Sequence, residues 1–240
     1  MNRQTILKSL TAAGIGSRRR LADAIKQGRV TLNGQVVSDF RQPVAAGDVI
    51  AVDGKKVDTD VIGAKTYIIL NKPVGILSAS SDERGGETAL DILPPQYRKQ
   101  RLYPAGRLDK DSSGLLLLTN DGELTYQLTH PRYEHQKEYL VYIKRELTAD
   151  EVPRLEKGVE LDDGRTAPAR VKPVSQPPYN YSITIHEGRR RQVRRMLASL
   201  GHQVVELKRV RLGSLYLGNL KEGEVRALSA IEARRALKNP

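Results

Sequence analysis

The sequence predicts an α+β protein in two parts: a small N-terminal module of two helices and a small antiparallel sheet, then a domain with a mainly antiparallel mixed sheet. Three observations support this organisation. Apolar residues recur at helical spacing over residues 6–27. A polar stretch over residues 58–65 divides the chain, and strand-type patterns outnumber helical ones beyond it. We therefore expect a module over residues 1–60, a linker over 61–66 and a domain over 67–240.

Two helices are expected to open the module. The apolar spacing over residues 6–13 predicts the first helix, and the Gly-Ile-Gly segment at 14–16 ends it. Ser17 is a typical N-cap for a second helix, which we expect to run to Gln27 and to stop at Gly28.

Strands are predicted from apolar runs bounded by turn residues. Val30 and Leu32 alternate with polar residues before an Asn-Gly turn at 33–34, which predicts a hairpin. The continuous apolar run at 115–118 is typical of a strand buried on both faces. The other predicted elements are strands at 49–52, 67–70, 138–143 and 181–185, a helix over 190–200, and a helix that begins with a capping box at Ser229 and Glu232.

Net charge gives the first indication of function. Forty Lys and Arg against 28 Asp and Glu give a net charge of +12, which favours a polyanionic partner. Residues 186–211 carry eight Lys and Arg but only two Glu, a local net charge of +6. Such clustering is typical of a surface that contacts phosphates. Charge alone leaves open the alternative of a protein that is basic without binding nucleic acid.

Composition also excludes several classes of protein. The chain has no cysteine, so it contains neither disulfides nor thiolate metal sites. It has no run of 18 apolar residues that could span a membrane, and no apolar segment typical of a signal peptide near residue 1. We therefore expect a cytoplasmic protein. We also expect a monomer, because no exposed apolar stripe stands out.

Three arginines at 18–20 begin the second predicted helix, although the helix dipole disfavours cations at that end. Free backbone N–H groups at a helix N-terminus bind phosphate, and Arg18 and Arg19 would add guanidinium groups that do the same. This conflict with the dipole indicates that an anion binds there. Simple solvation of a helix face is the alternative interpretation.

The surrounding pattern resembles the S4 RNA-binding domain. The matching segments are Leu-x-x-Leu at 7–10, Ala-Gly-Ile-Gly-Ser-Arg-Arg at 13–19 and Ile-x-x-Gly-Arg-Val-x-Leu-Asn-Gly at 25–34. The resemblance covers residues 3–60. It implies binding to structured RNA and no catalytic activity in this module.

Candidate catalytic residues emerge by elimination. The chain lacks the glycine-rich phosphate loops of nucleotide enzymes and the Gly-x-Ser-x-Gly motif of serine hydrolases. His130 and His135 have poor spacing for a metal. The remaining candidate is the polar segment 104–114 before the apolar run, which places the Asp109 carboxylate at the edge of a buried strand. A calcium-type loop is disfavoured because no bidentate Glu follows at the required spacing.

Four segments together resemble the pseudouridine synthases that modify ribosomal RNA. They are Leu-Asn-Lys-Pro-x-Gly at 70–75, Gly-Arg-Leu-Asp-Lys-Asp-Ser-Ser-Gly-Leu-Leu-Leu-Leu-Thr-Asn-Asp-Gly at 106–122, Lys-Glu-Tyr at 137–139 and Glu-Gly-Arg-x-x-Gln-Val-Arg-Arg-Met at 187–196. They span residues 67–212. The resemblance implies that a uridine in RNA is isomerised to pseudouridine, and this reaction requires neither a metal nor another cofactor.

The resemblance also implies roles for individual residues. Asp109 would be the nucleophile, which attacks either C1′ of the sugar or C6 of the base. Arg194 would pair with Asp109, and Tyr139 would stack on the uracil. Arg107 would take the place of the flipped-out base or hold a phosphate, and Ile183 would form an apolar wall beneath the base. The expected phosphate contacts are Arg189, Arg190, Arg191 and Arg195.

The substrate is expected to be ribosomal RNA, either free or in an assembling ribosomal particle. The triple-arginine helix start and the Gln-Val-Arg segment at 192–194 resemble the enzymes of 23S rRNA more than those of 16S rRNA. A 16S rRNA enzyme is the first alternative. A non-catalytic S4-type RNA-binding or ribosome-associated factor is the second, and it is disfavoured because Asp109, Tyr139 and Arg194 are all present.

Overall fold

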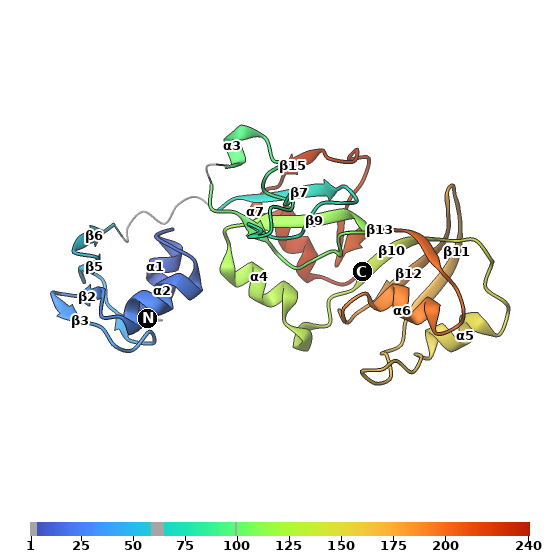
Figure 1. Cartoon of the computed structure of the whole chain (residues 1–240), viewed down its shortest axis with the longest axis horizontal. Helices are drawn as coiled ribbons and strands as arrows, with labels where there is room; N and C mark the ends of the chain where they lie inside the picture. Colours follow the sequence, from blue (N-terminus) through green and yellow to red (C-terminus); the bar gives the residue numbers. More distant parts are fainter. Residues whose placement is uncertain (1–3, 59–64, 99) are drawn as a thin grey trace. The chain divides into compact units, whose positions relative to one another are not determined.

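The computed structural model describes residues 4–58, 65–98 and 100–240 (Figure 1). The chain divides into two compact units, residues 1–64 and 65–240, which are described separately below. The predicted linker at 61–66 falls largely on residues 59–64, which lie outside the described residues.

The N-terminal unit contains two helices and a small antiparallel sheet, as predicted. Ser17 accepts a hydrogen bond from the backbone N–H of Arg20 and so caps the second helix. Asn33 and Gly34 both have positive φ (52° and 82°), the conformation that the predicted hairpin turn requires. The elements are α1 (Ile6–Ala12), α2 (Arg18–Lys26), a four-stranded sheet of β3 (Gln35–Val36), β2 (Val30–Leu32), β5 (Ile50–Val52) and β6 (Lys55–Val57), and a separate pair of β1 (Gln4–Thr5) and β4 (Pro43–Val44).

This unit has its own hydrophobic core. One side of each helix packs on the four-stranded sheet, and the most completely buried side chains are Ile6, Leu10, Ile25, Val30 and Ile50. Full burial of an aliphatic side chain contributes about 1.5–3 kcal/mol, so this cluster offsets much of the entropy lost on ordering a small domain.

The C-terminal unit is built on a nine-stranded sheet. Seven strands follow the order β11-β12-β10-β13-β9-β7-β15, while β14 pairs with β13 and β8 pairs with β9. The bounds are β7 (Tyr67–Lys72), β8 (Tyr103–Pro104), β9 (Ser113–Thr119), β10 (Lys137–Ile143), β11 (Arg170–Gln176), β12 (Tyr179–Ile185), β13 (Val204–Leu212), β14 (Leu215–Tyr216) and β15 (Val225–Ala227).

One parallel pairing joins the two halves of this sheet. Strands β9 and β13 run parallel with Ser113 opposite Lys208 and Gly114 opposite Arg209, whereas the other strand pairings of the described unit are antiparallel. Gly114 has a φ of +105°, and a Cβ at this position would lie 2.2 Å from the backbone O of Arg209. Only glycine allows this close approach. The predicted mainly antiparallel mixed sheet is therefore confirmed.

The apolar run in β9 is buried on both faces, as predicted. Leu116 and Leu118 belong to one hydrophobic cluster, and Leu115 and Leu117 belong to another on the opposite face. The helices of this unit are α3 (Pro95–Arg98), α4 (Gly122–Thr129), η1 (Pro131–Tyr133), α5 (Glu151–Glu156), α6 (Gln192–Ala198), α7 (Ala230–Ala233) and η2 (Arg234–Leu237). None of the helices in the described part of the chain is long and apolar enough to cross a membrane.

Two helix starts test the predicted boundaries. The capping box of Ser229 and Glu232 is present at the start of α7. The helix predicted from residue 190 instead begins at Gln192, because Arg191 adopts a left-handed conformation with a φ of 53°. This difference places Arg189, Arg190 and Arg191 on a loop, where their side chains leave in different directions.

Candidate active site

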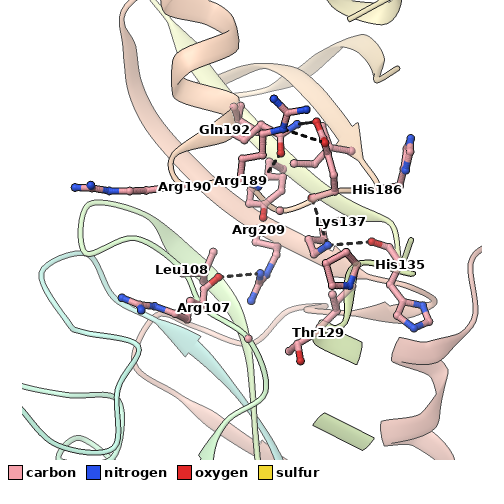
Figure 2. A pocket seen from close by; sticks show the side chains of 18 of the residues that line it. Arg107, Leu108, Thr129, His135, Lys137, His186, Arg189, Arg190, Gln192 and Arg209 are labelled. Carbon is pink, nitrogen blue, oxygen red and sulfur yellow. Dashed lines mark hydrogen bonds and ion pairs between the residues drawn. The ribbon is translucent and has the colours of Figure 1, made fainter. Parts of the chain in front are cut away.

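A cavity of about 720 Å³ opens in the C-terminal unit (Figure 2). Four segments that are distant in sequence enclose it: the loop between β8 and β9, the end of α4 with the following chain, the start of β10, and the loop between β12 and α6. Strand β13 contributes to its floor through Leu207, Arg209 and Leu212. The cavity brings together Asp109, Tyr139, Arg107, Arg189, Arg190 and Arg191.

The loop that carries Asp109 is held by neighbours on both sides. The hydroxyl of Ser78 lies 3.0 Å from both the backbone N and the backbone O of Leu108. The N–H of Gly75 donates to the carbonyl of Lys110 (2.8 Å), and the N–H of Ser112 donates to the carbonyl of Asp109 (3.1 Å). These bonds fix the main chain around Asp109, whose half-buried carboxylate lines the cavity. Among the described residues, no hydrogen bond or ion pair engages that carboxylate.

Arg194 forms its ion pair with Asp111 instead of the expected Asp109. Its Nη2 donates to the backbone O of Asp111 (2.7 Å), and its Nε lies 3.4 Å from the Asp111 carboxylate. Arg191 adds a bidentate contact to the same carboxylate (2.8 and 2.6 Å). The reason is local: Asp111 offers both a carbonyl and a carboxylate to the two guanidinium groups.

The charges near Asp111 shift several pKa values. The hydrogen bond from Arg191 is the main cause of a lowered pKa of Asp111. Burial lowers the pKa of Arg194, and the neighbouring carboxylates of Asp111 and Asp109 oppose that effect. Arg194 is therefore close enough to Asp109 to attract it, although Asp111 holds its side chain.

Tyr139 and Ile183 are direct neighbours on adjacent strands. Tyr139 of β10 lies opposite Ile183 of β12 on one side and opposite Arg209 of β13 on the other. Tyr139 lines the cavity, as expected for a residue that stacks on a base. Ile183 is fully buried and is not part of the cavity lining. The apolar lining next to Tyr139 comes from Ile185, Val193, Leu207 and Leu212, so Ile183 supports the floor from outside the cavity.

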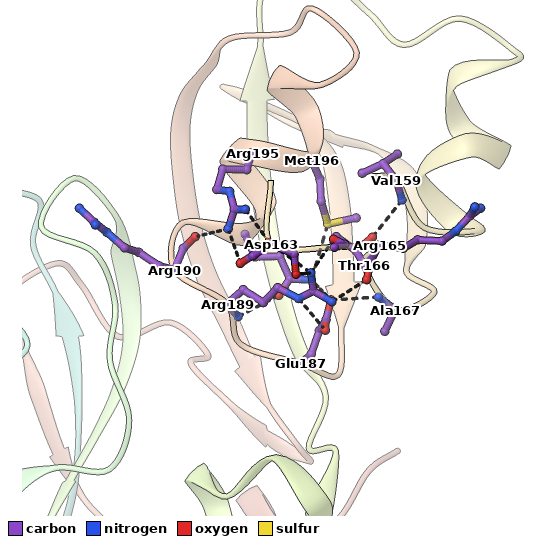
Figure 3. A network of polar contacts seen from close by, with 12 residues as sticks. Val159, Asp163, Arg165, Thr166, Ala167, Glu187, Arg189, Arg190, Arg195 and Met196 are labelled. Carbon is purple, nitrogen blue, oxygen red and sulfur yellow. Dashed lines mark hydrogen bonds and ion pairs between the residues drawn. The ribbon is translucent and has the colours of Figure 1, made fainter. Parts of the chain in front are cut away.

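The arginines expected to contact phosphate divide into two groups. Arg107 and Arg190 are exposed, line the cavity and point to the same side of it (Figure 2). Arg189 and Arg195 instead bind the acidic turn around Asp162 and Asp163 (Figure 3).

The contacts of Arg189 and Arg195 use most of their donors. Arg189 donates to the carbonyls of Gly164 (2.7 Å) and Arg165 (2.5 Å), and its Nε lies 3.2 Å from the Glu187 carboxylate. Arg195 binds Asp163 (2.6 Å) and also Asp162. Hydrogen bonds from Arg195 hold the pKa of Asp163 near 2. Sequence clustering did not reveal this network, because the carboxylates of the turn lie 26 to 33 residues away.

Sequence reasoning also missed three cations that are held by backbone carbonyls. The Lys72 ammonium donates to the carbonyls of Pro73 (2.7 Å) and Ile76 (2.9 Å). The Lys137 ammonium lies 3.1 and 3.4 Å from the carbonyls of His135 and Glu187. Arg209 donates to those of Leu115 (2.8 Å) and Arg107 (3.4 Å). Lys137 was predictable in principle, because residues two apart on a strand share a face and Tyr139 was already a candidate.

Burial lowers the pKa of each of these two lysines to about 8. For Lys72, the carboxylates of Glu222 and Asp109 oppose the effect. For Lys137, the positive charge of Arg209 adds to it, while Glu187 opposes it. Both ammonium groups are still mainly protonated at neutral pH.

In the N-terminal unit, Arg18 and Arg19 lie in the first turn of α2, both exposed to solvent. Together with Leu7, Ala22, Lys26 and Phe40 they line a shallow groove. The structure therefore places both residues on the surface where the sequence predicted RNA contacts.

The chain resembles known proteins over nearly its whole length. It is 41% identical to the ribosomal large subunit pseudouridine synthase B of Bacillus subtilis (strain 168), over 97% of this chain and 95% of that protein. It is 38% identical to an uncharacterized RNA pseudouridine synthase of Aquifex aeolicus (strain VF5), over 97% and 93%. A crystal structure of a pseudouridylate synthase matches with a TM-score of 0.68 and 31% identity, over 97% of this chain and 99% of that one.

Two sequence profiles divide the chain as the structure does. The S4 domain profile matches residues 5–50, within the N-terminal unit. The RNA pseudouridylate synthase profile matches residues 66–199, which include the Asp109 loop, Tyr139 and Arg194. With a matching fold, relatives that cover both units and a cavity that contains Asp109 and Tyr139, the chain belongs to the RNA pseudouridylate synthase family.

Proposed function

We propose that this chain isomerises a uridine of ribosomal RNA to pseudouridine, with 23S rRNA as the substrate. The observation that carries the proposal is the Asp109 carboxylate, which lines the same cavity as Tyr139 and has no side-chain partner among the described residues. The choice of 23S rRNA is supported by the name of the Bacillus subtilis relative.

Asp109 is the proposed nucleophile. Its main chain is fixed by Ser78 and Gly75, so the carboxylate meets the substrate with little loss of conformational freedom. Arg194 acts through Asp111: it holds the loop beyond Asp109 and adds positive charge nearby. Its role is to position the loop that carries Asp109.

Tyr139 is the proposed stacking partner of the uracil. A uridine in folded RNA must leave its stack to enter a cavity of this size, and an aromatic floor compensates for the lost stacking. Arg107 and Arg190 at the rim are the proposed contacts to the flanking phosphates, together with the outer face of Arg191. Arg18 and Arg19 of the S4 domain are proposed to bind a second stretch of the RNA backbone.

Tritium release from [5-³H]uridine-labelled RNA tests the function. Wild-type protein should release tritium from 23S rRNA and not from 16S rRNA, because C5 loses its proton when it bonds to the sugar. Asp109→Asn should reduce the rate by about 10⁴-fold or more, as removal of a nucleophile does elsewhere. Asp111→Asn is the matched control: it should remain active at a reduced rate, because it loosens the loop and leaves the nucleophile in place.

Each alternative has its own outcome in this assay. Release from 16S rRNA alone would reassign the substrate. Binding of both RNAs without any release would support a non-catalytic RNA-binding factor. Equal rates for wild type and Asp109→Asn would show that Asp109 is not the nucleophile. Mapping pseudouridines in both rRNAs of a deletion strain identifies the position that is modified.

A further inference from the structure

Lys137 and Arg209 flank Tyr139 on the floor of the cavity. Arg209 lies directly opposite Tyr139 in the pairing of β10 with β13, and Lys137 precedes Tyr139 by two residues on the same face of β10. Side chains of directly opposed residues lie about 4.5–5.5 Å apart at Cβ. A planar ring stacked on Tyr139 would therefore present its edge to both cations.

Neither cation forms an ion pair with a carboxylate within the described chain. Lys137 and Arg209 bind backbone carbonyls only, and the Nη2 of Arg209 is buried without any hydrogen-bond partner. Arg211, two residues along β13, shows the usual alternative. It is equally buried, but its guanidinium binds the Glu138 carboxylate at 2.7 Å.

Burying a cation without a counter-charge costs free energy unless an anion binds to it. Carbonyl groups satisfy N–H donors but carry no net charge, so the floor of the cavity holds two positive charges without an ion pair among the described residues. The carboxylate of Glu187 attracts Lys137 without forming an ion pair with it. The apolar side chains of Ile185, Leu207 and Leu212 surround these charges and strengthen their effect on any group that enters. The floor of the cavity therefore favours binding of a group that carries or develops negative charge.

We propose that Lys137 and Arg209 bind the ring oxygens of the target uracil and stabilise the negative charge that develops there during isomerisation. The proposal rests on the proposed function. Attack of Asp109 at C1′ breaks the C1′–N1 bond and leaves its electron pair on the uracil. Attack at C6 breaks the C5=C6 π bond and moves that pair toward O4, and the C1′–N1 bond then breaks with its electron pair on N1, which O2 shares. Both routes therefore place negative charge on the ring oxygens. Both end when C5 bonds to C1′, the C5 proton leaves to a base, N1 takes up a proton and the bond to the Asp109 carboxylate breaks.

Burial favours the uracil over a phosphate as the bound group. The Arg209 side chain is 3% exposed, at the bottom of the cavity, whereas Arg107 and Arg190 at the rim remain open to solvent. A phosphate diester would lose most of its hydration to reach the floor, while it can bind the rim arginines at little cost. An uncharged base loses much less hydration on entering the cavity.

Single-turnover rates at saturating enzyme test the proposal. Lys137→Gln and Arg209→Gln should each slow tritium release by roughly 10²–10³-fold, the usual effect of removing one donor to a developing oxyanion. Affinity for the RNA should stay within a few-fold of wild type. Lys137→Arg should recover much of the rate, because the charge is kept. Lys208→Gln is the matched control on the opposite face of β13 and should leave the rate unchanged.

A leaving-group comparison separates charge stabilisation from a merely structural role. Substrate RNA with 5-fluorouridine at the target position carries a ring that tolerates negative charge better. Because fluorine replaces the C5 proton, the final deprotonation cannot occur, and the earlier steps are followed as the loss of 5-fluorouridine from nuclease digests of the RNA. If Lys137 and Arg209 stabilise that charge, the two Gln variants should lose much less rate on this RNA than on normal RNA. A structural defect would cost the same on both.

The outcomes distinguish this proposal from the proposed function. Absence of tritium release by wild type contradicts the function itself. Given an active wild type, equal losses on the two RNAs, unchanged rates in the Gln variants, or a loss of affinity without a loss of rate would each overturn the assignment of Lys137 and Arg209. Circular dichroism of the Gln variants verifies that the sheet is intact.

Discussion

Two groups of cations in the same domain differ in what neutralises them. Arg189 and Arg195 bind carboxylates at the turn of Asp162 and Asp163, so their charge is cancelled within the protein. Within the part of the chain that the structure describes, Lys137 and Arg209 on the floor of the cavity bind only backbone carbonyls. A compensated cation stabilises the fold, whereas an uncompensated one is available to the substrate. Basic residues must therefore be sorted by their partners before an RNA-binding role is assigned.

The largest effect on activity and stability is expected from a change that prevents the Arg209 guanidinium from reaching its carbonyl partners. Gly114→Ala places a Cβ 2.2 Å from the backbone O of Arg209, at a φ that L-residues rarely adopt. We expect β9 and β13 to separate, with loss of activity and a large fall in Tm. Gly164→Ala, at a similar φ with open space around it, is the control and should lower Tm far less. An active, stable Gly114→Ala enzyme would contradict the close approach of these strands.

The second test is pH, which should move activity and stability in opposite directions. Lys72 and Lys137 have a pKa of about 8 in the folded protein, against 10.5 for an ordinary lysine. Above pH 8 the folded protein loses these protons before the unfolded chain does, so folding stability should rise between about pH 8 and 10. Above pH 10 it should fall, because burial raises the pKa of Tyr67 and Tyr179 to about 12.

Activity should decline where stability rises. With the uncharged form of Lys137 unable to stabilise an oxyanion, kcat/KM should fall about tenfold per pH unit above pH 8. The nearby groups that act on this lysine are Arg209 and Glu187. Lys137→Arg should make the decline shallower, because arginine stays charged. A wild-type rate that does not change from pH 7 to 9 would show that the Lys137 ammonium takes no part in the reaction.

A pair of arginine variants sharpens the comparison at the rim. Arg190→Gln should weaken RNA binding and reduce the slope of log affinity against log salt by about 1, as expected for one lost phosphate contact. Arg195→Gln should leave this slope unchanged and lower Tm by roughly 2–4 °C. Each variant removes one positive charge, and the two positions are five residues apart, Arg190 on the loop before α6 and Arg195 within α6, so each serves as the control for the other. If Arg195→Gln reduced the salt slope and Arg190→Gln lowered Tm instead, Arg195 would be the phosphate contact and Arg190 the residue that stabilises the fold.

The smallest expected effect is at acid pH. The pKa of Asp163 is lowered to about 2, so its contribution to stability is present above about pH 4 and is lost as the pH falls through 2. Asp163→Asn should flatten this part of the stability curve, measured by urea unfolding. Asp150→Asn is the control and should change the curve less, because among the described residues the Asp150 carboxylate receives only a hydrogen bond from Thr148.

Much of the fold could be predicted from the sequence, because strand and helix patterns depend on neighbouring residues. The Asn-Gly turn, the capping box of Ser229 and the doubly buried strand β9 are all of this kind. Local patterns also gave the surface positions of Arg18 and Arg19. The start of α6 was predicted two residues too early, because the left-handed conformation of Arg191 leaves no mark in the pattern of apolar residues.

The candidate site was less predictable, since its geometry depends on partners that are distant in sequence. The motifs gave Asp109 and Tyr139, and both line the cavity. They did not indicate that Arg194 binds Asp111, or that the carboxylates opposite Arg189 and Arg195 come from a turn about 30 residues earlier. The motifs did not indicate Arg209 either. What distinguishes its guanidinium is the lack of an ion pair among the described residues, and a sequence pattern does not show such an absence.

The position of β13 in the sheet has a consequence for the order of synthesis. Asp109 and Tyr139 are 30 residues apart in the chain, yet β9 and β10 are not neighbours: β13, at residues 204–212, lies between them. Asp109 and Tyr139, the proposed nucleophile and stacking residue, are therefore synthesised well before the strand that joins the two halves of the sheet. The N-terminal unit, with its own core, can fold first. The nascent protein should therefore form the core of its N-terminal unit before the cavity, which requires β13.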